Sequence, residues 1–204
     1  MAPIVGVLIS YLAGSIPSAF LAGKIRGVDL RKHGSGNLGA TNVARVLGGK
    51  IAIAVFVADV LKGFLPVFFL PRYTETLQPE IWALAFGIAA IIGHVKPIFL
   101  LGRGGGKGVA TATGVFLALA PIPTMITQAV WIAIFYFTRY VSLASLVAAA
   151  LLPIAIFVLQ RNASSPVFIA SLAISTFVFW THRANIGRLR RGEEHRFVKK
   201  ETPA

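Results

Sequence analysis

Long apolar runs, separated by short polar segments, occupy most of this chain and restrict its fold more than any other feature. A helix that crosses a bilayer needs about 20 mainly apolar residues, and backbone in lipid must satisfy its own hydrogen bonds, which favours helices. Because 56% of the residues are hydrophobic, we predict an all-α polytopic membrane protein. The runs are Ala2–Gly23, Lys50–Leu70, Ile81–Leu101, Val109–Phe137, Val141–Leu159 and Pro166–Thr181.

The fourth run is longer than one perpendicular span requires. Pro121 and Pro123 lie near its middle, and two prolines so close together interrupt a helix because proline has no amide hydrogen. We therefore expect two short helices, Val109–Ala120 and Thr124–Phe137. This division predicts seven transmembrane helices, or five if the short helices are merged or peripheral.

Charge is distributed unevenly along the chain, with 20 Lys and Arg against 7 Asp and Glu and a formal net charge of +13. The basic residues cluster between the apolar runs, which is typical of cytoplasmic loops and not of a nucleic-acid-binding surface. No Lys or Arg precedes the first run, so we expect an uncleaved first span with the N-terminus outside and the C-terminus cytoplasmic. We expect a single domain, 1–204, whose end, 182–204, includes a basic cytoplasmic tail.

A glycine-rich segment, residues 102–108, joins the third and fourth runs. Its glycines allow the backbone to approach a ligand closely, and Arg103 and Lys107 supply positive charge. A helix beginning at Val109 would direct its first N–H groups at this segment. The combination predicts an anion site, most naturally for phosphate; the alternative is a flexible basic hairpin. The glycines in question are Gly104, Gly105, Gly106 and Gly108.

A second polar segment, 33–45, is unusually rich in small hydroxyl and amide side chains for a membrane protein. These groups offer hydrogen bonds to a polyoxygenated ligand, and Arg45 offers a bidentate fork to phosphate. The spacing of its glycines matches a dinucleotide-binding turn, but no strand precedes them, which excludes that interpretation. The alternative is that the polar groups only cap and pack the loop. They are Ser35, Asn37, Thr41 and Asn42.

Ionisable residues also lie inside the apolar runs. Asp59 and Lys62 are three residues apart, share one helix face and can neutralise each other in lipid. We favour a structural ion pair over a functional one. His94 precedes the glycine-rich segment, and it is either a base or phosphate ligand or a packed histidine satisfied by backbone.

The tail begins with residues that a helix would bring together. Asn185 and Arg188 are i,i+3 neighbours on any helical continuation of the last run, and His182 lies one turn before Asn185. One face would then present all three side chains to the site formed by the other loops. Glu193 and Glu194 are expected to hold neighbouring arginines and not to act in catalysis.

Three blocks of the chain resemble the signature blocks of the PlsY family of bacterial acyl-phosphate:glycerol-3-phosphate acyltransferases. They are GSGNLGATNVAR at 34–45, GGKGVAT at 105–111 and HRANIGRLRRGEE at 182–194. The resemblance implies transfer of a fatty acyl group from acyl-phosphate to the 1-hydroxyl of glycerol 3-phosphate, giving lysophosphatidic acid and inorganic phosphate in phospholipid biosynthesis. The chain departs from the pattern at Gly104, an extra glycine that leaves open which N–H groups meet the anion.

The resemblance also supports a set of catalytic residues without dividing the roles among them. These are Ser35, Arg45, Lys107, His182 and Asn185. The expected substrate-binding residues are Gly36, Asn37, Thr41, Asn42, Gly104, Gly105, Gly106, Gly108, Ser142 and Arg188. Acyl-phosphate is already activated, so positioning and charge neutralisation can supply most of the barrier reduction. Either its own phosphate or His182 is expected to accept the hydroxyl proton.

We expect no cofactor and no metal. The chain contains no cysteine, which excludes a thiolate nucleophile and a cysteine-based metal site. Asp29 and Asp59 are too few and too separated for a two-metal site. A histidine followed by aspartate five residues later, the base of the soluble-headed glycerolipid acyltransferases, is also absent.

Two other classes of function remain open from the residues alone. A transporter or binding protein for a phosphorylated solute would also use helix N-termini aimed at anions, but the polar blocks are all expected on one membrane face, whereas alternating access needs both. A lipid-binding scaffold would explain the basic tail but not the Ser35–Arg45 segment. We expect a bacterial inner-membrane protein with a cytoplasmic active site and membrane lipid as partner; acyl-chain preference and oligomeric state stay open, with a monomer as the default.

Overall fold

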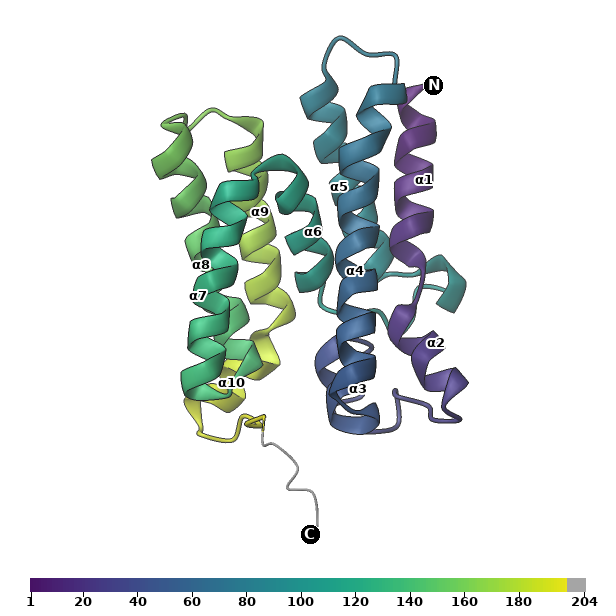
Figure 1. Ribbon diagram of the computed structural model, residues 1–204, viewed down its shortest axis with the longest axis vertical. Coiled ribbons are helices and arrows are strands. Elements are labelled where there is room, and N and C mark those ends of the chain that lie inside the picture. The colour runs from purple at the N-terminus through teal and green to yellow at the C-terminus, as the bar shows by residue number, and fades with distance from the viewer. Residues whose placement is uncertain (198–204) are drawn as a thin grey trace. The chain divides into compact units, whose positions relative to one another are not determined.

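The computed structural model describes residues 1–197, and all of their regular secondary structure is helical (Figure 1). The chain divides into two compact units, Met1–Pro121 and Ile122 onward. The first unit holds α1 (Pro3–Ser15), α2 (Ser18–Ile25), α3 (Ala40–Leu47), α4 (Gly49–Phe69), α5 (Pro79–Val95) and α6 (Val109–Leu119), with short 3-10 turns at Leu70–Tyr73 and Ile98–Leu100. The second holds α7 (Pro121–Thr138), α8 (Val141–Gln160), α9 (Pro166–Thr181) and α10 (Arg183–Arg190).

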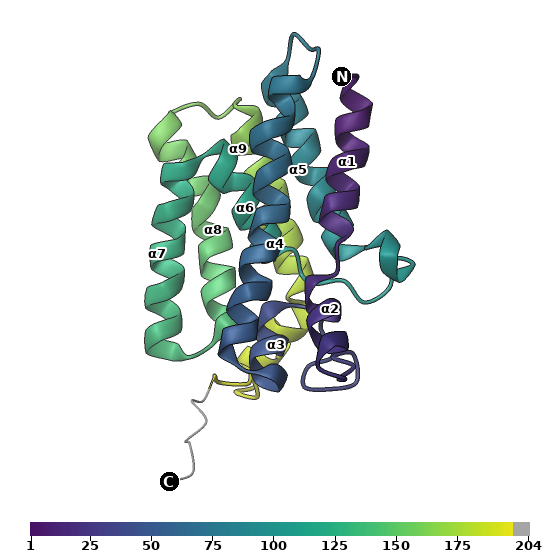
Figure 2. The ribbon, with the colours of Figure 1, turned by 45° about the vertical axis from the view of Figure 1, so that its right-hand side comes forward.

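The first apolar run forms two helices and not one. α1 ends at Ser15 and α2 begins at Ser18, with Pro17 between them. Because Pro17 has no amide hydrogen, the ladder of helical hydrogen bonds is interrupted there. Figure 2 shows α2 as a separate helix below α1.

Glycines allow the helices of the first unit to pack at short distances. α1 lies along α5, and α4 lies along α6. A Cβ atom added at Gly14 would overlap the Ala90 carbonyl of α5, and one added at Gly114 would overlap the Val60 carbonyl of α4. Small residues at helix crossings are a usual device in membranes, where close backbone contact replaces the hydrophobic driving force.

A small apolar core holds the loop between α2 and α3. α3 lies beside the first turns of α4 (Figures 1 and 2), and the loop sends two leucine side chains into the core between them. The buried core residues are Ala19, Leu30, Leu38, Val43, Ala52 and Val55.

The predicted interruption of the fourth run is confirmed. α6 ends at Leu119, and α7 begins at Pro121 and not at Thr124 as expected. Pro121 and Pro123 occupy the first turn of α7, where the absent amide hydrogen leaves no bond unmade.

Among residues 1–197, five helical segments are long and apolar enough to cross a membrane, or six if α9 and α10, which are bent by 60°, count as one span. The 11-residue α6 extends for only about 16 Å, against a bilayer core of about 30 Å. The chain is therefore an all-α multi-pass membrane protein. Seven spans and the outside N-terminus stay predictions.

In the second unit, the segment after α10 returns to the turn between α7 and α8. The backbone N–H of Phe197 donates to the Arg139 carbonyl at 2.9 Å, and Arg196 Nε donates to the Tyr140 hydroxyl at 2.9 Å. α8 packs along α9. These contacts place residues 193–197 beside the N-terminus of α8.

Candidate functional site

Asn42 on α3 holds the first polar loop in place. Its side chain is 1% exposed; Oδ1 accepts the backbone N–H of Ser35 at 2.8 Å, and Nδ2 donates to the carbonyls of Leu30 and His33, both at 3.1 Å. A Cβ atom at Gly34 would overlap Asn42 Oδ1, which accounts for glycine there. The Asn42 amide therefore organises the loop, as the alternative interpretation of this segment has it; its contact with substrate stays a prediction.

The remaining polar residues of this segment keep exposed surface. Ser35 is exposed, whereas Asn37, Thr41 and Arg45 are half-buried. Thr41 and Arg45 lie one turn apart on α3 and therefore share a face. Gly36 adopts a positive φ of 71°, which allows the loop to turn just after Ser35.

Asp29 and Arg31 form a fork within the same loop. Arg31 donates to both carboxylate oxygens of Asp29, at 2.9 and 3.0 Å. These bonds, together with the backbone N–H of Arg31, lower the pKa of Asp29 to about 2. The charge of Arg31 is therefore neutralised by Asp29 within the loop. Arg45, in contrast, is expected to direct its charge at a substrate phosphate.

The glycine-rich segment packs against the C-terminal end of α5. The Gly106 N–H donates to the His94 carbonyl at 3.3 Å, and a Cβ atom at Gly105 would overlap the Val95 carbonyl. We expected the glycine N–H groups to face an anion. At Gly106 this expectation is wrong, because that N–H is bonded to α5; at Gly104, Gly105 and Gly108 it stays a prediction.

Lys107 follows Gly106 and is half-buried. The next residue, Gly108, has a φ of 84° and precedes the first residue of α6. A side chain at this position would be strained in that conformation, so glycine permits the abrupt start of α6. Lys107 is thereby held between the backbone anchored on α5 and the N-terminus of α6.

In the second unit, Glu194 joins three side chains. Its Oε1 accepts hydrogen bonds from Ser142 Oγ at 2.9 Å and from Asn185 Nδ2 at 2.7 Å, and its Oε2 lies 2.7 Å from Arg188 Nε. Burial raises the pKa of the Glu194 carboxyl, but the hydrogen bonds from Asn185, Ser142 and Arg188 outweigh that effect and leave it below its usual value. Glu194 is therefore a buried carboxylate at the centre of the cluster.

This arrangement confirms part of what the sequence suggested. Glu193 pairs with Arg191 at 2.7 Å and Glu194 pairs with Arg188, so both glutamates hold neighbouring arginines. The link to Ser142 was not foreseen, because 52 residues separate it from Glu194 and no sequence pattern relates them.

His182 lies at the bend between α9 and α10 and is 4% exposed. The two helices meet at 60°, so the helix that carries Asn185 and Arg188 is not a straight continuation of α9. The structure does keep Asn185 and Arg188 on one face of α10. His182 Nδ1 lies 2.9 Å from the Val178 carbonyl; since a carbonyl only accepts, Nδ1 is the donor in this hydrogen bond.

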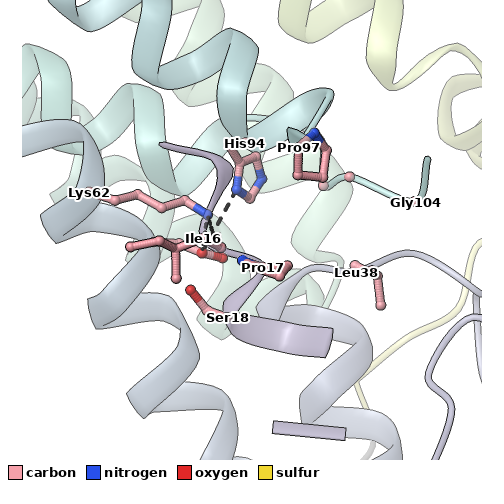
Figure 3. A pocket seen from close by; sticks show the side chains of 11 residues that line it. Ile16, Pro17, Ser18, Leu38, Lys62, His94, Pro97 and Gly104 are labelled. Carbon is pink, nitrogen blue, oxygen red and sulfur yellow. Dashed lines mark hydrogen bonds and ion pairs between the residues drawn. The ribbon is translucent and has the colours of Figure 1, made fainter. Parts of the chain in front are cut away.

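Asp59, Lys62 and His94 form a buried cluster in the first unit and line the same small space as the glycine-rich segment; Figure 3 shows the Lys62 and His94 side chains turned toward each other. Lys62 and Asp59 form the predicted ion pair at 2.8 Å. His94 is buried, 7% exposed, and its Nδ1 lies 3.8 Å from Asp59 Oδ1; both interpretations of this residue stay predictions. Among residues 1–197, no group of three or more His, Asp or Glu side chains is placed to hold a metal ion.

Comparisons with known proteins agree on one family. A family model described as glycerol-3-phosphate acyltransferase matches residues 4–192. A curated relative with that name from Fusobacterium nucleatum is 44% identical over 192 residues, covering 94% of this chain and 96% of the relative. One from Aquifex aeolicus is 44% identical over 194 residues, covering 94% and 97%.

Solved structures give the same result. A crystal structure of PlsY, an integral membrane glycerol 3-phosphate acyltransferase, in its glycerol 3-phosphate form has a TM-score of 0.88 and 39% identity, covering 96% of both chains. The lysophosphatidic acid form has a TM-score of 0.83 at the same identity, covering 96% of this chain and 95% of that one.

Proposed function

The chain belongs to the glycerol-3-phosphate acyltransferase family, and we propose that it transfers a fatty acyl group from acyl-phosphate to the 1-hydroxyl of glycerol 3-phosphate. Acyl transfer to glycerol 3-phosphate follows from the family and its curated relatives. The observation that carries the proposal is the likeness to PlsY in its glycerol 3-phosphate form, at 39% identity over 96% of both chains. The products are lysophosphatidic acid and inorganic phosphate.

The identity of the acyl donor rests on chemistry and on the sequence blocks. Acyl-phosphate carries its own leaving group, and the three sequence blocks resemble those of a family that uses acyl-phosphate. Two cationic side chains on half-buried positions of the first unit, Arg45 and Lys107, suit a phosphate leaving group.

The reaction is a single displacement at the acyl carbonyl carbon. The 1-hydroxyl oxygen of glycerol 3-phosphate bonds to that carbon, and the bond from the carbon to the phosphate oxygen breaks. Phosphate departs with the electron pair, while the hydroxyl proton passes to the departing phosphate or to Nε2 of His182. Lys107 and Arg45 neutralise the charge that develops on the phosphate, where preorganised cations contribute most.

The polar side chains orient the acceptor. Ser35 and Thr41 supply hydroxyl groups, and Asn185 and Arg188 supply donors that Glu194 holds in fixed positions. Because Glu194 neutralises part of the Arg188 charge, Arg188 acts mainly by directional hydrogen bonds. Because these hydrogen-bond donors are already fixed, less entropy is lost when the acceptor is oriented for the transition state.

We also propose that the enzyme lies in the bacterial inner membrane with this chemistry at the cytoplasmic face. The support is the distribution of basic residues, which follows the positive-inside rule in the loop segments 24–49 and 102–108. The acyl chain of the donor remains in lipid, and its phosphate reaches the charged segments.

Purified protein in detergent tests the donor directly. With glycerol 3-phosphate present, acyl-phosphate should yield lysophosphatidic acid and acyl-CoA should not. Equal use of acyl-CoA would overturn the proposed donor, and lysophosphatidic acid from neither would overturn the proposed reaction.

Single substitutions test the residue roles. Lys107→Ala and Arg45→Ala should each lower activity about 100-fold or more at unchanged expression. Arg103→Ala is the matched control, because Arg103 is an exposed cation in the same segment as Lys107, and it should keep most activity. Near-normal rates for Lys107→Ala would move the site elsewhere.

A further inference from the structure

Three ionisable side chains that the proposed chemistry does not use meet inside the first unit. Asp59 Oδ1 lies 2.8 Å from Lys62 Nζ and 3.8 Å from His94 Nδ1, and none of the three residues is more than 7% exposed. Figure 3 shows Lys62 and His94 converging from two different helices, α4 and α5. Ionisable groups at membrane depth are costly and usually serve a function, so packing alone is a poor explanation.

Lys62 connects the cluster to the break between α1 and α2. Its Nζ donates to the Ile16 carbonyl at 3.0 Å, just after the last residue of α1. Pro17 interrupts the helix there, so this carbonyl lies at a helix C-terminus, where a cation is favourable. The cluster is therefore bonded to the backbone just after the end of α1.

His94 connects the cluster to the glycine-rich segment. Its ring nitrogen Nε2 lies against Gly106 so closely that a Cβ atom there would overlap the ring. The His94 carbonyl accepts the Gly106 N–H at 3.3 Å. His94 thus contacts Gly106 through both its side chain and its backbone, and Lys107 is the next residue.

The space enclosed by the cluster and this segment is too small for a substrate. It has a volume of about 10 Å³ and is lined by the three ionisable side chains, by Leu38 and by Gly104, Gly105 and Gly106. Such a volume holds about one water molecule. Because this space is water-sized, the contact of His94 with Gly106 is the link between the cluster and the glycine-rich segment.

We propose that Asp59, Lys62 and His94 are positioning residues for Lys107. Asp59 holds Lys62 and His94 between α4 and α5, Lys62 ties them to the end of α1, and His94 fixes Gly106 and so the start of the Lys107 side chain. The inference rests on the proposed function, in which Lys107 neutralises the leaving phosphate.

Because the chain contains no cysteine, a single label can report on the segment directly. Arg103→Cys carries a nitroxide spin label, and its mobility is measured by electron paramagnetic resonance in detergent, with and without His94→Ala. The label should become more mobile when His94 is removed. A label at Glu80→Cys, exposed at the other end of α5, should not change.

Ile91→Ala is the matched control for loss of packing. Ile91 is buried on α5, 3% exposed, so its truncation also removes side-chain volume from the unit. It should leave the Arg103 label unchanged. Equal mobility changes in the two variants, or none in His94→Ala, would overturn the proposal. If His94→Ala does not fold, His94→Gln replaces it. Glutamine keeps a polar atom within reach of Gly106, so it should increase the mobility of the label at residue 103 by less than alanine does.

A double-mutant cycle tests the coupling to Lys107. His94→Ala should lower kcat by about 10- to 100-fold, as expected for a misplaced catalytic group, and should leave the KM of glycerol 3-phosphate nearly unchanged. In a Lys107→Ala background the same substitution should change kcat by less than about twofold, because the two residues act as a unit. Losses that multiply would overturn the proposal. A wild-type protein that makes no lysophosphatidic acid would instead overturn the proposed function, while the label experiment would still stand.

Discussion

Glu194 gathers Ser142, Asn185 and Arg188, although it lies in a segment without regular secondary structure. Its carboxylate accepts hydrogen bonds from Ser142, Asn185 and Arg188, so its charge state affects how these donors are arranged. The sequence could predict that Asn185 and Arg188 share a helix face, because the spacing is local. It could not predict Ser142 at the same carboxylate, because that contact depends on how the chain returns after α10.

The charge of Glu194 should appear in the pH dependence of stability. Its pKa is lowered from the ordinary value of 4.5 in the folded protein, so the stabilisation is fully present above about pH 4.5 and is lost as pH falls through the lower folded value. Thermal unfolding of the purified protein between pH 6 and pH 3 should show a smaller decrease of Tm for Glu194→Gln than for wild type. Glu193→Gln, which removes an exposed pair, should follow wild type. Parallel curves for Glu194→Gln and wild type would contradict this account.

The buried pair of Asp59 and Lys62 gives a second prediction at this scale. Asp59→Asn leaves the buried Lys62 without its counter-ion and should destabilise the protein by about 3–5 kcal/mol. Asp59→Asn combined with Lys62→Met removes both charges and should be more stable than the single variant, measured by thermal unfolding in detergent. Both should lose activity, because neither keeps the contacts that hold His94. A double variant less stable than Asp59→Asn would contradict the ion-pair interpretation.

At the scale of the elements, glycines decide how closely the helices of the first unit approach. Gly114→Ala places a Cβ atom against the Val60 carbonyl and should destabilise the protein by about 1–3 kcal/mol through overpacking. Gly49→Ala is the control, because no atom lies within 4 Å of its added Cβ, and it should be neutral or stabilising by up to about 1 kcal/mol. Thermal unfolding of the two variants separates them. Equal stability would mean that α4 and α6 do not meet as described.

Most helices could be predicted from apolar length and proline positions. α4, α8 and α9 agree with their apolar runs within one residue at each end. The division at Pro121 followed from proline chemistry. Pro17 carried the same signal for the break between α1 and α2, which together still form one candidate span, Pro3–Ile25. The 60° bend at His182 has no proline or glycine at the bend itself, so local chemistry gave no indication of it.

The glycine-rich segment shows where a local motif is ambiguous. Its composition predicted close approach of the backbone, and the structure confirms close approach at Gly105 and Gly106, but to the end of α5. A glycine that admits a ligand and a glycine that admits another part of the chain look the same in a sequence. Only the fold decides between them, and here it assigns these two positions to anchoring Lys107.

At the scale of the whole molecule, the proposed function is that of a multi-pass membrane enzyme whose cationic side chains act on a substrate that already carries its leaving group. In this proposal Arg45 and Lys107 supply charge, and Glu194 binds Asn185 and Arg188. This division of roles among the residues predicts that acyl transfer and phosphate release occur in the same step. Hydrolysis of the donor by water should be slow when the acceptor is absent.

The ratio of the two products tests this claim most directly. Purified protein in detergent is given acyl-phosphate, with and without glycerol 3-phosphate, and lysophosphatidic acid and inorganic phosphate are measured in the same sample. The account predicts one phosphate released for each lysophosphatidic acid formed, and almost none of either without glycerol 3-phosphate. Phosphate release that does not depend on glycerol 3-phosphate, or that proceeds without lysophosphatidic acid, would contradict it.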